Sequence, residues 1–107
     1  MADARRVLLC AKSEVELGAV RRFDVDGGPI ALVHCTSGFR AVRDVCSHED
    51  YPLSEGDVFA EECEIECLRH GSMFSLIDGE PQSLPATRPI TVVPVEVDAE
   101  GVWAVLA

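Results

Sequence analysis

Short apolar runs separated by turn residues recur along the whole chain. Six of these runs predict β-strands: 7–11, 29–35, 39–45, 73–77, 91–97 and 102–106. Most are bordered by turn sequences, such as Asp26-Gly27-Gly28 before 29–35, and in 91–97 we expect Val93, Val95 and Val97 to share one face. Because no helical period is sustained, the pattern predicts an antiparallel all-β sandwich or barrel-like domain. Only 13–17 is expected to form a helical turn, capped by Ser13.

The length and the overall composition restrict the possibilities further. A chain of 107 residues predicts one domain, 1–107, in which the region of about 45–89 interrupts the strand pattern with two long loops. No apolar run approaches the length of a membrane span, and the first residues lack the layout of a secretory signal. We therefore expect a cytoplasmic protein that does not enter membranes, and a monomer.

The charge of the chain is strongly negative and unevenly distributed. The net charge is −10, and nine carboxylates without any Lys or Arg lie between residues 44 and 66. Nucleic acids and anionic membranes need a basic surface, so both are disfavoured as partners. Two interpretations of the acidic segment stay open. It is either a solvated loop that aids solubility, or a docking surface around a functional site that attracts a partner with basic residues.

A paired arrangement of cysteine and histidine carries the chemistry. The motif Cys46-Ser47-His48 is followed, after eighteen residues, by Cys67-Leu68-Arg69-His70. Two irons bridged by two sulfides need four terminal ligands, and this set can place two thiolates on one iron and two imidazoles on the other. Zinc also accepts Cys₂His₂ sets, although zinc fingers usually group the two cysteines before the two histidines. The candidate metal ligands are therefore Cys46, His48, Cys67 and His70.

Three stretches extend this motif to a known family. Residues 46–56 and 67–74 resemble the two cluster loops of the soluble Rieske ferredoxins that serve bacterial ring-hydroxylating oxygenases, and 84–89 is similar to their proline-containing loop. The resemblance implies a Rieske-like β-sandwich with a small two-loop cluster-binding subdomain. It also implies one [2Fe–2S] cluster per chain, with the cysteines on the inner iron and the histidines on the outer, exposed one.

The same resemblance implies a function. The protein would carry single electrons from a flavin-dependent ferredoxin reductase to a terminal non-haem iron oxygenase, without being an enzyme itself. Three alternatives stay open at this stage: an electron carrier for another pathway such as iron–sulfur assembly, a zinc-stabilised interaction module, and a redox sensor.

Departures from the respiratory type of Rieske protein predict a low reduction potential. That type links its two loops through a second pair of cysteines, whose places here look like Tyr51 and Arg69. It also uses a tyrosine hydroxyl toward a ligand sulfur where this chain has Phe74. Fewer donors to the sulfurs stabilise added negative charge less well. By resemblance, Ser72 could donate a hydrogen bond to a bridging sulfide, and this bond would raise the reduction potential.

The remaining cysteines and the third histidine are expected to be structural. We expect buried, reduced thiols rather than a disulfide framework at Cys10, Cys35 and Cys63. Cys63 precedes Cys67 by four residues and is a weaker alternative ligand. His34 is expected to be a strand residue with a satisfied side chain and no further role.

Overall fold

The computed structural model describes residues 5–47, 51–69, 71–84 and 86–106, which form ten strands and two short 3₁₀ turns. The strands are β1 (Arg5–Cys10), β2 (Val20–Val25), β3 (Gly28–Cys35), β4 (Gly38–Arg43), β5 (Val58–Phe59), β6 (Glu64–Glu66), β7 (Met73–Ser75), β8 (Val92–Val93), β9 (Val95–Asp98) and β10 (Gly101–Leu106). The turns are η1 (Lys12–Glu14) and η2 (Leu53–Glu55). All strand pairs are antiparallel, so the predicted all-β class is confirmed.

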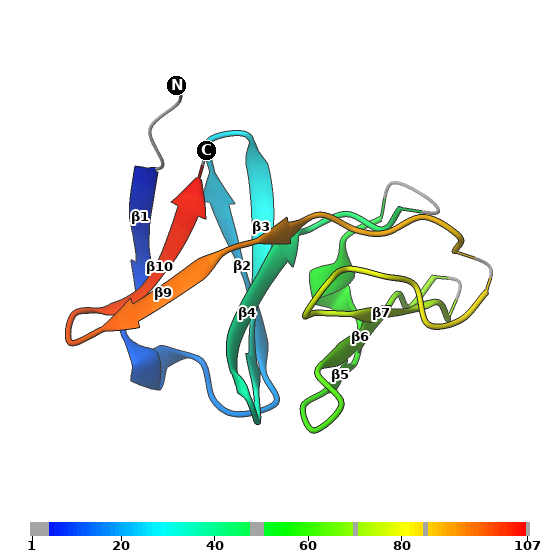
Figure 1. Cartoon of the computed structure of the whole chain (residues 1–107), viewed down its shortest axis with the longest axis horizontal. Coiled ribbons are helices and arrows are strands. Elements are labelled where there is room, and N and C mark those ends of the chain that lie inside the picture. The colour runs from blue at the N-terminus through cyan, green and yellow to red at the C-terminus, as the bar shows by residue number, and fades with distance from the viewer. Residues whose placement is uncertain (1–4, 48–50, 70, 85, 107) are drawn as a thin grey trace.

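Two sheets form the base of the molecule, on the left of Figure 1. One has the order β1-β10-β9 and the other the order β2-β3-β4-β8. Inward-facing side chains of both sheets make up one apolar core, to which β3 contributes Ile30 and Leu32 and β10 contributes Val102, Ala104 and Leu106. These positions alternate along the strands, as expected when one face of a strand turns toward a core.

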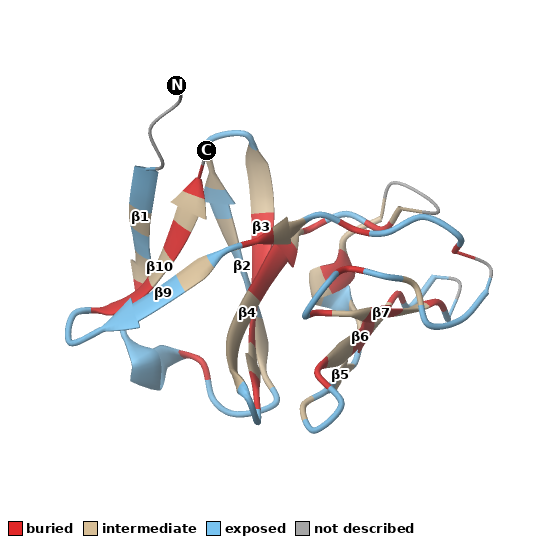
Figure 2. Cartoon of the chain, in the orientation of Figure 1, coloured by how far each residue is buried: buried red, intermediate tan, exposed pale blue. Residues whose placement is uncertain are grey.

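A third, smaller sheet of order β5-β6-β7 lies beside the base and belongs to the predicted loop region (Figure 1). Its core includes Ile65 and Phe74, and β3 completes it from the other side with Ala31, Val33 and Cys35. Strand β3 is therefore buried on both faces, and Figure 2 shows buried residues in red along it. A strand with two buried faces reads as a nearly continuous apolar run, and between Pro29 and Cys35 only the partly buried His34 interrupts it.

Three local predictions need correction. The helical turn begins one residue earlier, and the side chain of Glu14, not that of Ser13, caps it by accepting a hydrogen bond from the backbone N–H of Ala11. The predicted strand 91–97 is two strands in different sheets, because Pro94 has no N–H with which to continue a ladder. Val97 is consequently 46% exposed and does not share a buried face with Val93.

The prediction that Cys35 and Cys63 are reduced thiols is wrong. Cys35 ends β3, Cys63 directly precedes β6, and the two form a disulfide with their Cα atoms 5.3 Å apart. This separation lies within the ordinary range for the bond. Cys63 is therefore not an alternative metal ligand, whereas Cys10 is a buried free thiol as expected. Over the described part of the chain, no helix has the length and apolar character needed to cross a membrane.

Candidate metal centre

The first candidate loop leaves the base sheet at the end of β4. Cys46 lies in it as a buried free cysteine, and its backbone N–H donates a 2.9 Å hydrogen bond to the carbonyl of Tyr51. The loop returns through η2, where the fully buried Leu53 anchors it in the same core as Ile65 and Phe74. Leu53 and the loop's own backbone thus help to hold this polar loop on the small sheet.

The second candidate loop is the tight connection between β6 and β7. Cys67 is fully buried and free of any disulfide; its N–H donates to the Ser72 carbonyl over 2.8 Å, and the Gly71 N–H donates to the Cys67 carbonyl over 2.7 Å. Gly71 has φ of +73°, a left-handed conformation that a side chain would strain. Gly71 thus meets a backbone requirement at this turn.

The third stretch, 84–89, is bonded to both loops. The Ala86 N–H donates to the buried Ser72 hydroxyl over 3.1 Å, and the Ser47 hydroxyl donates to the Arg88 carbonyl. The similarity of this stretch to a covering loop is consistent with these contacts. Because the Ser72 oxygen accepts from Ala86, its own hydrogen is left to donate elsewhere.

The candidate ligands differ in what the structure shows of them. Cys46 and Cys67, one from each loop, belong to one buried cluster of side chains, whereas His48 and His70 lie outside the described residues. Over the residues that are described, no three His, Cys, Asp or Glu side chains gather into a metal site. Two buried cysteines that are not in the disulfide suit a cluster with thiolate ligands on its inner iron, so the donor chemistry fits the predicted group.

The acidic segment is not a uniform rim around these loops. Asp44 is buried, with its carboxylate bonded inside the protein. Glu61 and Glu62 lie in the connection between β5 and β6, which is at the opposite end of β6 from Cys67 (Figure 1). The interpretation of the acidic segment as a docking surface around the functional site therefore does not hold for these three residues.

His34 and Cys10 lie outside the two loops and have the structural roles that the sequence predicts. The Nδ1 atom of His34 is 2.9 Å from the Val15 carbonyl, and its ring stacks on Phe39 with centroids 4.1 Å apart. The third histidine therefore has its polar group satisfied. Burial raises the pKa of the Cys10 thiol, and the nearby Glu14 adds to this effect while Arg21 opposes it.

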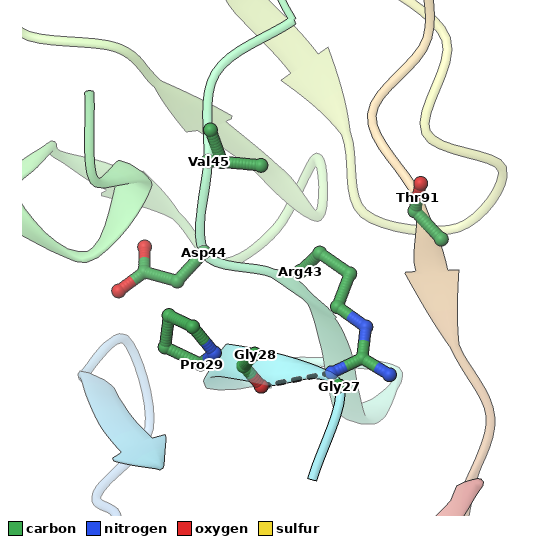
Figure 3. Close-up of a pocket in the computed structure, with 7 residues that line it drawn as sticks. All are labelled: Gly27, Gly28, Pro29, Arg43, Asp44, Val45 and Thr91. Atoms are coloured by element: carbon green, nitrogen blue, oxygen red, sulfur yellow. Dashed lines mark hydrogen bonds between the residues drawn. The ribbon is translucent and has the colours of Figure 1, made fainter. Parts of the chain in front are cut away.

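A cleft of about 300 Å³ lies where the first loop joins the base (Figure 3). Its charged lining residues are Arg43, which donates to the Gly28 carbonyl over 2.8 Å, and Asp44. Figure 3 shows the Asp44 carboxylate turned away from the Arg43 guanidinium. The two groups therefore do not face each other as an acid–base pair in this cleft.

Comparison with known proteins shows which family has this fold. Residues 5–94 match the Rieske [2Fe-2S] domain. Ferredoxin CarAc of Metapseudomonas resinovorans is 38% identical over 96 residues, which cover 89% of this chain and 88% of that protein. The solved ferredoxin of carbazole 1,9a-dioxygenase from Nocardioides aromaticivorans IC177 is similar with a TM-score of 0.87 and 31% identity, over 94% of this chain and 96% of that one.

A second solved structure is a complex of reduced oxygenase and oxidized ferredoxin in carbazole 1,9a-dioxygenase. The matching chain has a TM-score of 0.85 and 35% identity, over 92% of this chain and 91% of that one. The antiparallel fold and the match over residues 5–94 place the chain among the small iron–sulfur proteins. The chain belongs to the Rieske [2Fe–2S] family, its cofactor is a [2Fe–2S] cluster, and it is an electron carrier rather than a catalytic subunit. The zinc interpretation is thereby set aside.

Proposed function

We propose that Cys46, His48, Cys67 and His70 are the four cluster ligands of this ferredoxin. The observation that carries the proposal is the placement of Cys46 and Cys67 as buried cysteines, outside the disulfide, from two loops that share one core. The other three cysteines are unsuitable, because Cys35 and Cys63 are joined to each other and Cys10 belongs to the core between the two base sheets. The cluster supplies a reversible one-electron change, and the chain has to hold it near the surface.

The electron donor and acceptor are the second part of the proposal. We propose that this ferredoxin accepts single electrons from a flavin-dependent reductase and passes them to a terminal non-haem iron oxygenase. Support comes from the carbazole dioxygenase complex, in which a similar ferredoxin is bound to its oxygenase. A carrier for iron–sulfur assembly would share the cofactor, so the two roles differ only in the acceptor.

The surface next to the two cysteines suits close approach of a partner. Leu68, beside Cys67, is 53% exposed, and Leu84, in the third stretch, is 77% exposed. Exposed apolar side chains beside a buried redox site can exclude water when a partner docks. Both side chains lie in segments that bond to each other through Ser72 and Ala86, so the surface is held by the same contacts as the site.

The remaining properties are proposed from the same features. We expect one domain, because β3 contributes to both cores and so joins the base to the small sheet. We also propose a monomer in the cytoplasm. A disulfide is unusual in a reducing compartment, but Cys35 and Cys63 are both buried, which shields them from soluble thiols.

The cofactor and ligand assignment is tested by spectroscopy on the purified protein. Wild-type protein should be reddish-brown, contain two irons and two acid-labile sulfides per chain, and show the EPR signal of a reduced Rieske centre. Cys67→Ala and His70→Ala should both lose the native spectrum. Cys10→Ala is the matched control and should keep it. A cluster that persists in Cys67→Ala would contradict the ligand assignment.

The role is tested separately by electron transfer. The reduced protein, mixed with a terminal oxygenase and its aromatic substrate, should be reoxidised as hydroxylated product forms. Reoxidation only by proteins of iron–sulfur assembly would favour the alternative carrier role.

A further inference from the structure

Asp44 carries a carboxylate that is fully removed from solvent. It lies two residues before Cys46, and its side chain is 0% exposed. Its Oδ1 accepts a 2.7 Å hydrogen bond from the backbone N–H of Ser54, and its Oδ2 accepts a 2.6 Å bond from the Ser54 hydroxyl. An ionised group in such a place is costly unless it is paired and hydrogen-bonded. The two hydrogen bonds from Ser54 therefore help to offset the cost of burying the Asp44 carboxylate.

The third contact of Asp44 reaches the base of the molecule. The Nη1 atom of Arg22, on β2, is 3.3 Å from Asp44 Oδ2. Arg22 is partly exposed and also lies 3.7 Å from Asp24, an exposed carboxylate. Because the guanidinium is planar and has several donors, one arginine can meet both groups. Asp44 thus connects the base sheet to the loop that begins at its own position.

The two bonds to Ser54 close the first loop. Residues 44 and 54 stand on either side of Cys46, so a single side chain fixes both ends of the segment that carries it. The backbone of Asp44 is itself held, since its N–H donates to the Pro29 carbonyl over 3.0 Å. The loop is therefore clamped onto the base at one side and onto η2 at the other.

The clamp continues from η2 to the second loop. A side chain at Gly56 would overlap the carbonyl oxygen of Glu66, so the two backbones lie in direct contact there. The Glu66 N–H also donates to the Asp57 carbonyl over 2.9 Å. Glu66 immediately precedes Cys67. A path of contacts thus begins at the Asp44 carboxylate, passes to Ser54, and continues through the backbone at Gly56 to the residue beside the second cysteine.

We propose that Asp44 is a positioning residue that fixes the spacing between the two ligand-bearing loops. This inference rests on the proposed ligand set, because it is the distance between Cys46 and Cys67 that the contacts would govern. It also gives a role to a residue that the sequence groups with the acidic surface. The carboxylate acts by holding Ser54 and Arg22, not by approaching a partner.

The test compares four variants of the cluster-loaded protein. Asp44→Asn keeps the shape but removes the charge and places an NH₂ group opposite one of the two Ser54 donors. Ser54→Ala removes only the bond from the hydroxyl, and Arg22→Gln removes the ion pair with Asp44 together with the exposed contact to Asp24. Glu55→Gln is the control, because Glu55 lies in the same 3₁₀ turn but is exposed.

Three readouts separate positioning from general stability: the EPR spectrum of the reduced cluster, its midpoint potential, and the rate of bleaching by an iron chelator. We expect Asp44→Asn to bleach about tenfold faster or more, the scale found when groups that orient metal ligands are lost. Its EPR spectrum should shift or broaden, and Ser54→Ala should show a smaller change in the same direction. Glu55→Gln should match wild type.

The inference is overturned if Asp44→Asn only lowers the thermal stability while spectrum, potential and bleaching rate stay as in wild type. Should Asp44→Asn fail to fold, wild-type behaviour of both Ser54→Ala and Arg22→Gln overturns it equally. A failure of the proposed ligand set looks different. In that case the cluster of Cys67→Ala, or the metal content of the wild-type protein itself, gives the unexpected result.

Discussion

The guanidinium carbon of Arg69 lies 5.8 Å from the centre of the Tyr51 ring, so that side chains from the two cluster loops meet. By resemblance, these are the positions at which the respiratory type of Rieske protein joins its loops through two cysteines. A cation–π contact here takes the place of a covalent link. Such a contact is weak, worth about 0.5–1 kcal/mol at an exposed site.

We predict that this contact couples the loops measurably. In a double-mutant cycle with Tyr51→Leu and Arg69→Gln, the coupling free energy of unfolding should be about 0.5–1 kcal/mol, because each variant removes one partner of the pair. Tyr51→Phe is the control, since it keeps the ring and should keep the coupling with Arg69. Strictly additive effects of the two variants would show that the contact contributes nothing.

The Cys35–Cys63 disulfide gives a second prediction. When the protein is denatured with a chelator but without a reductant, an alkylating reagent should modify three cysteines, Cys10, Cys46 and Cys67. After reduction it should modify all five. The bond closes a loop with a sequence separation of 28, so Cys35→Ser should lower the free energy of unfolding by about 3–4 kcal/mol. Cys10→Ser tests a buried cysteine without this bond and should cost less. Alkylation of five cysteines without reductant would contradict the pairing.

The reduction potential gives a third prediction. Rieske centres span roughly −150 to +300 mV, and this one should lie below about 0 mV because Phe74 offers no hydroxyl to a ligand sulfur. Phe74 is fully buried in the same cluster of side chains as Cys46 and Cys67. Phe74→Tyr should therefore raise the midpoint if the hydroxyl finds a sulfur acceptor, whereas Phe74→Leu controls for altered packing. Redox titration near neutral pH that returns a strongly positive wild-type midpoint would refute this.

Features that are encoded within a few neighbouring residues could be predicted from the sequence. The alternation and turn residues around β3, β4 and β10 predicted strands, and the Cys and His spacing predicted the cofactor, because each signal lies within a few residues. Strands β5 and β6 escaped prediction because they are only two and three residues long, and β6 contains two glutamates. Pro94 was the available sign that 91–97 breaks between two sheets.

Pairings between distant segments could not be inferred in this way. Cys35 and Cys63 are brought together only by the packing of the small sheet against β3. The same holds for Asp44, which counts as one more negative charge in the sequence but is buried against Ser54 and Arg22. Charge counting assumes that carboxylates face solvent, and a buried carboxylate violates that assumption.

The Cys10 thiol gives a prediction about pH. Burial and Glu14 raise its pKa, so the folded protein keeps the proton at pH values where the unfolded chain has lost it. Above the unfolded pKa of about 8.5, the unfolded state binds fewer protons and stability falls as pH rises. The difference in unfolding free energy between wild type and Cys10→Ala should therefore shrink between pH 7 and pH 10. A difference that stays constant with pH would show that Cys10 does not cause this loss.

The final prediction concerns how the protein docks. Glu49 and Asp50 follow His48 in the first loop and lie outside the described residues, so their role is inferred from sequence alone. If a reductase approaches the proposed histidine ligands, Glu49→Lys and Asp50→Lys should slow reduction while leaving the cluster spectrum unchanged. Attraction between opposite charges speeds encounter, and salt weakens it as the Debye length shortens to about 8 Å at physiological ionic strength.

The structure supplies a closer control for this experiment than distant surface residues. Glu61 and Glu62 are exposed and belong to the same acidic segment, but they lie at the other end of β6 from Cys67. Glu61→Lys and Glu62→Lys change the net charge by the same amount as the reversals at Glu49 and Asp50. The second-order rate of reduction, measured against ionic strength, should respond more to the reversals in the first loop. The two pairs of reversals change the net charge equally and differ only in their position. Equal slowing by both pairs would therefore mean that the net charge of the protein, and not a docking face near the first loop, controls the encounter.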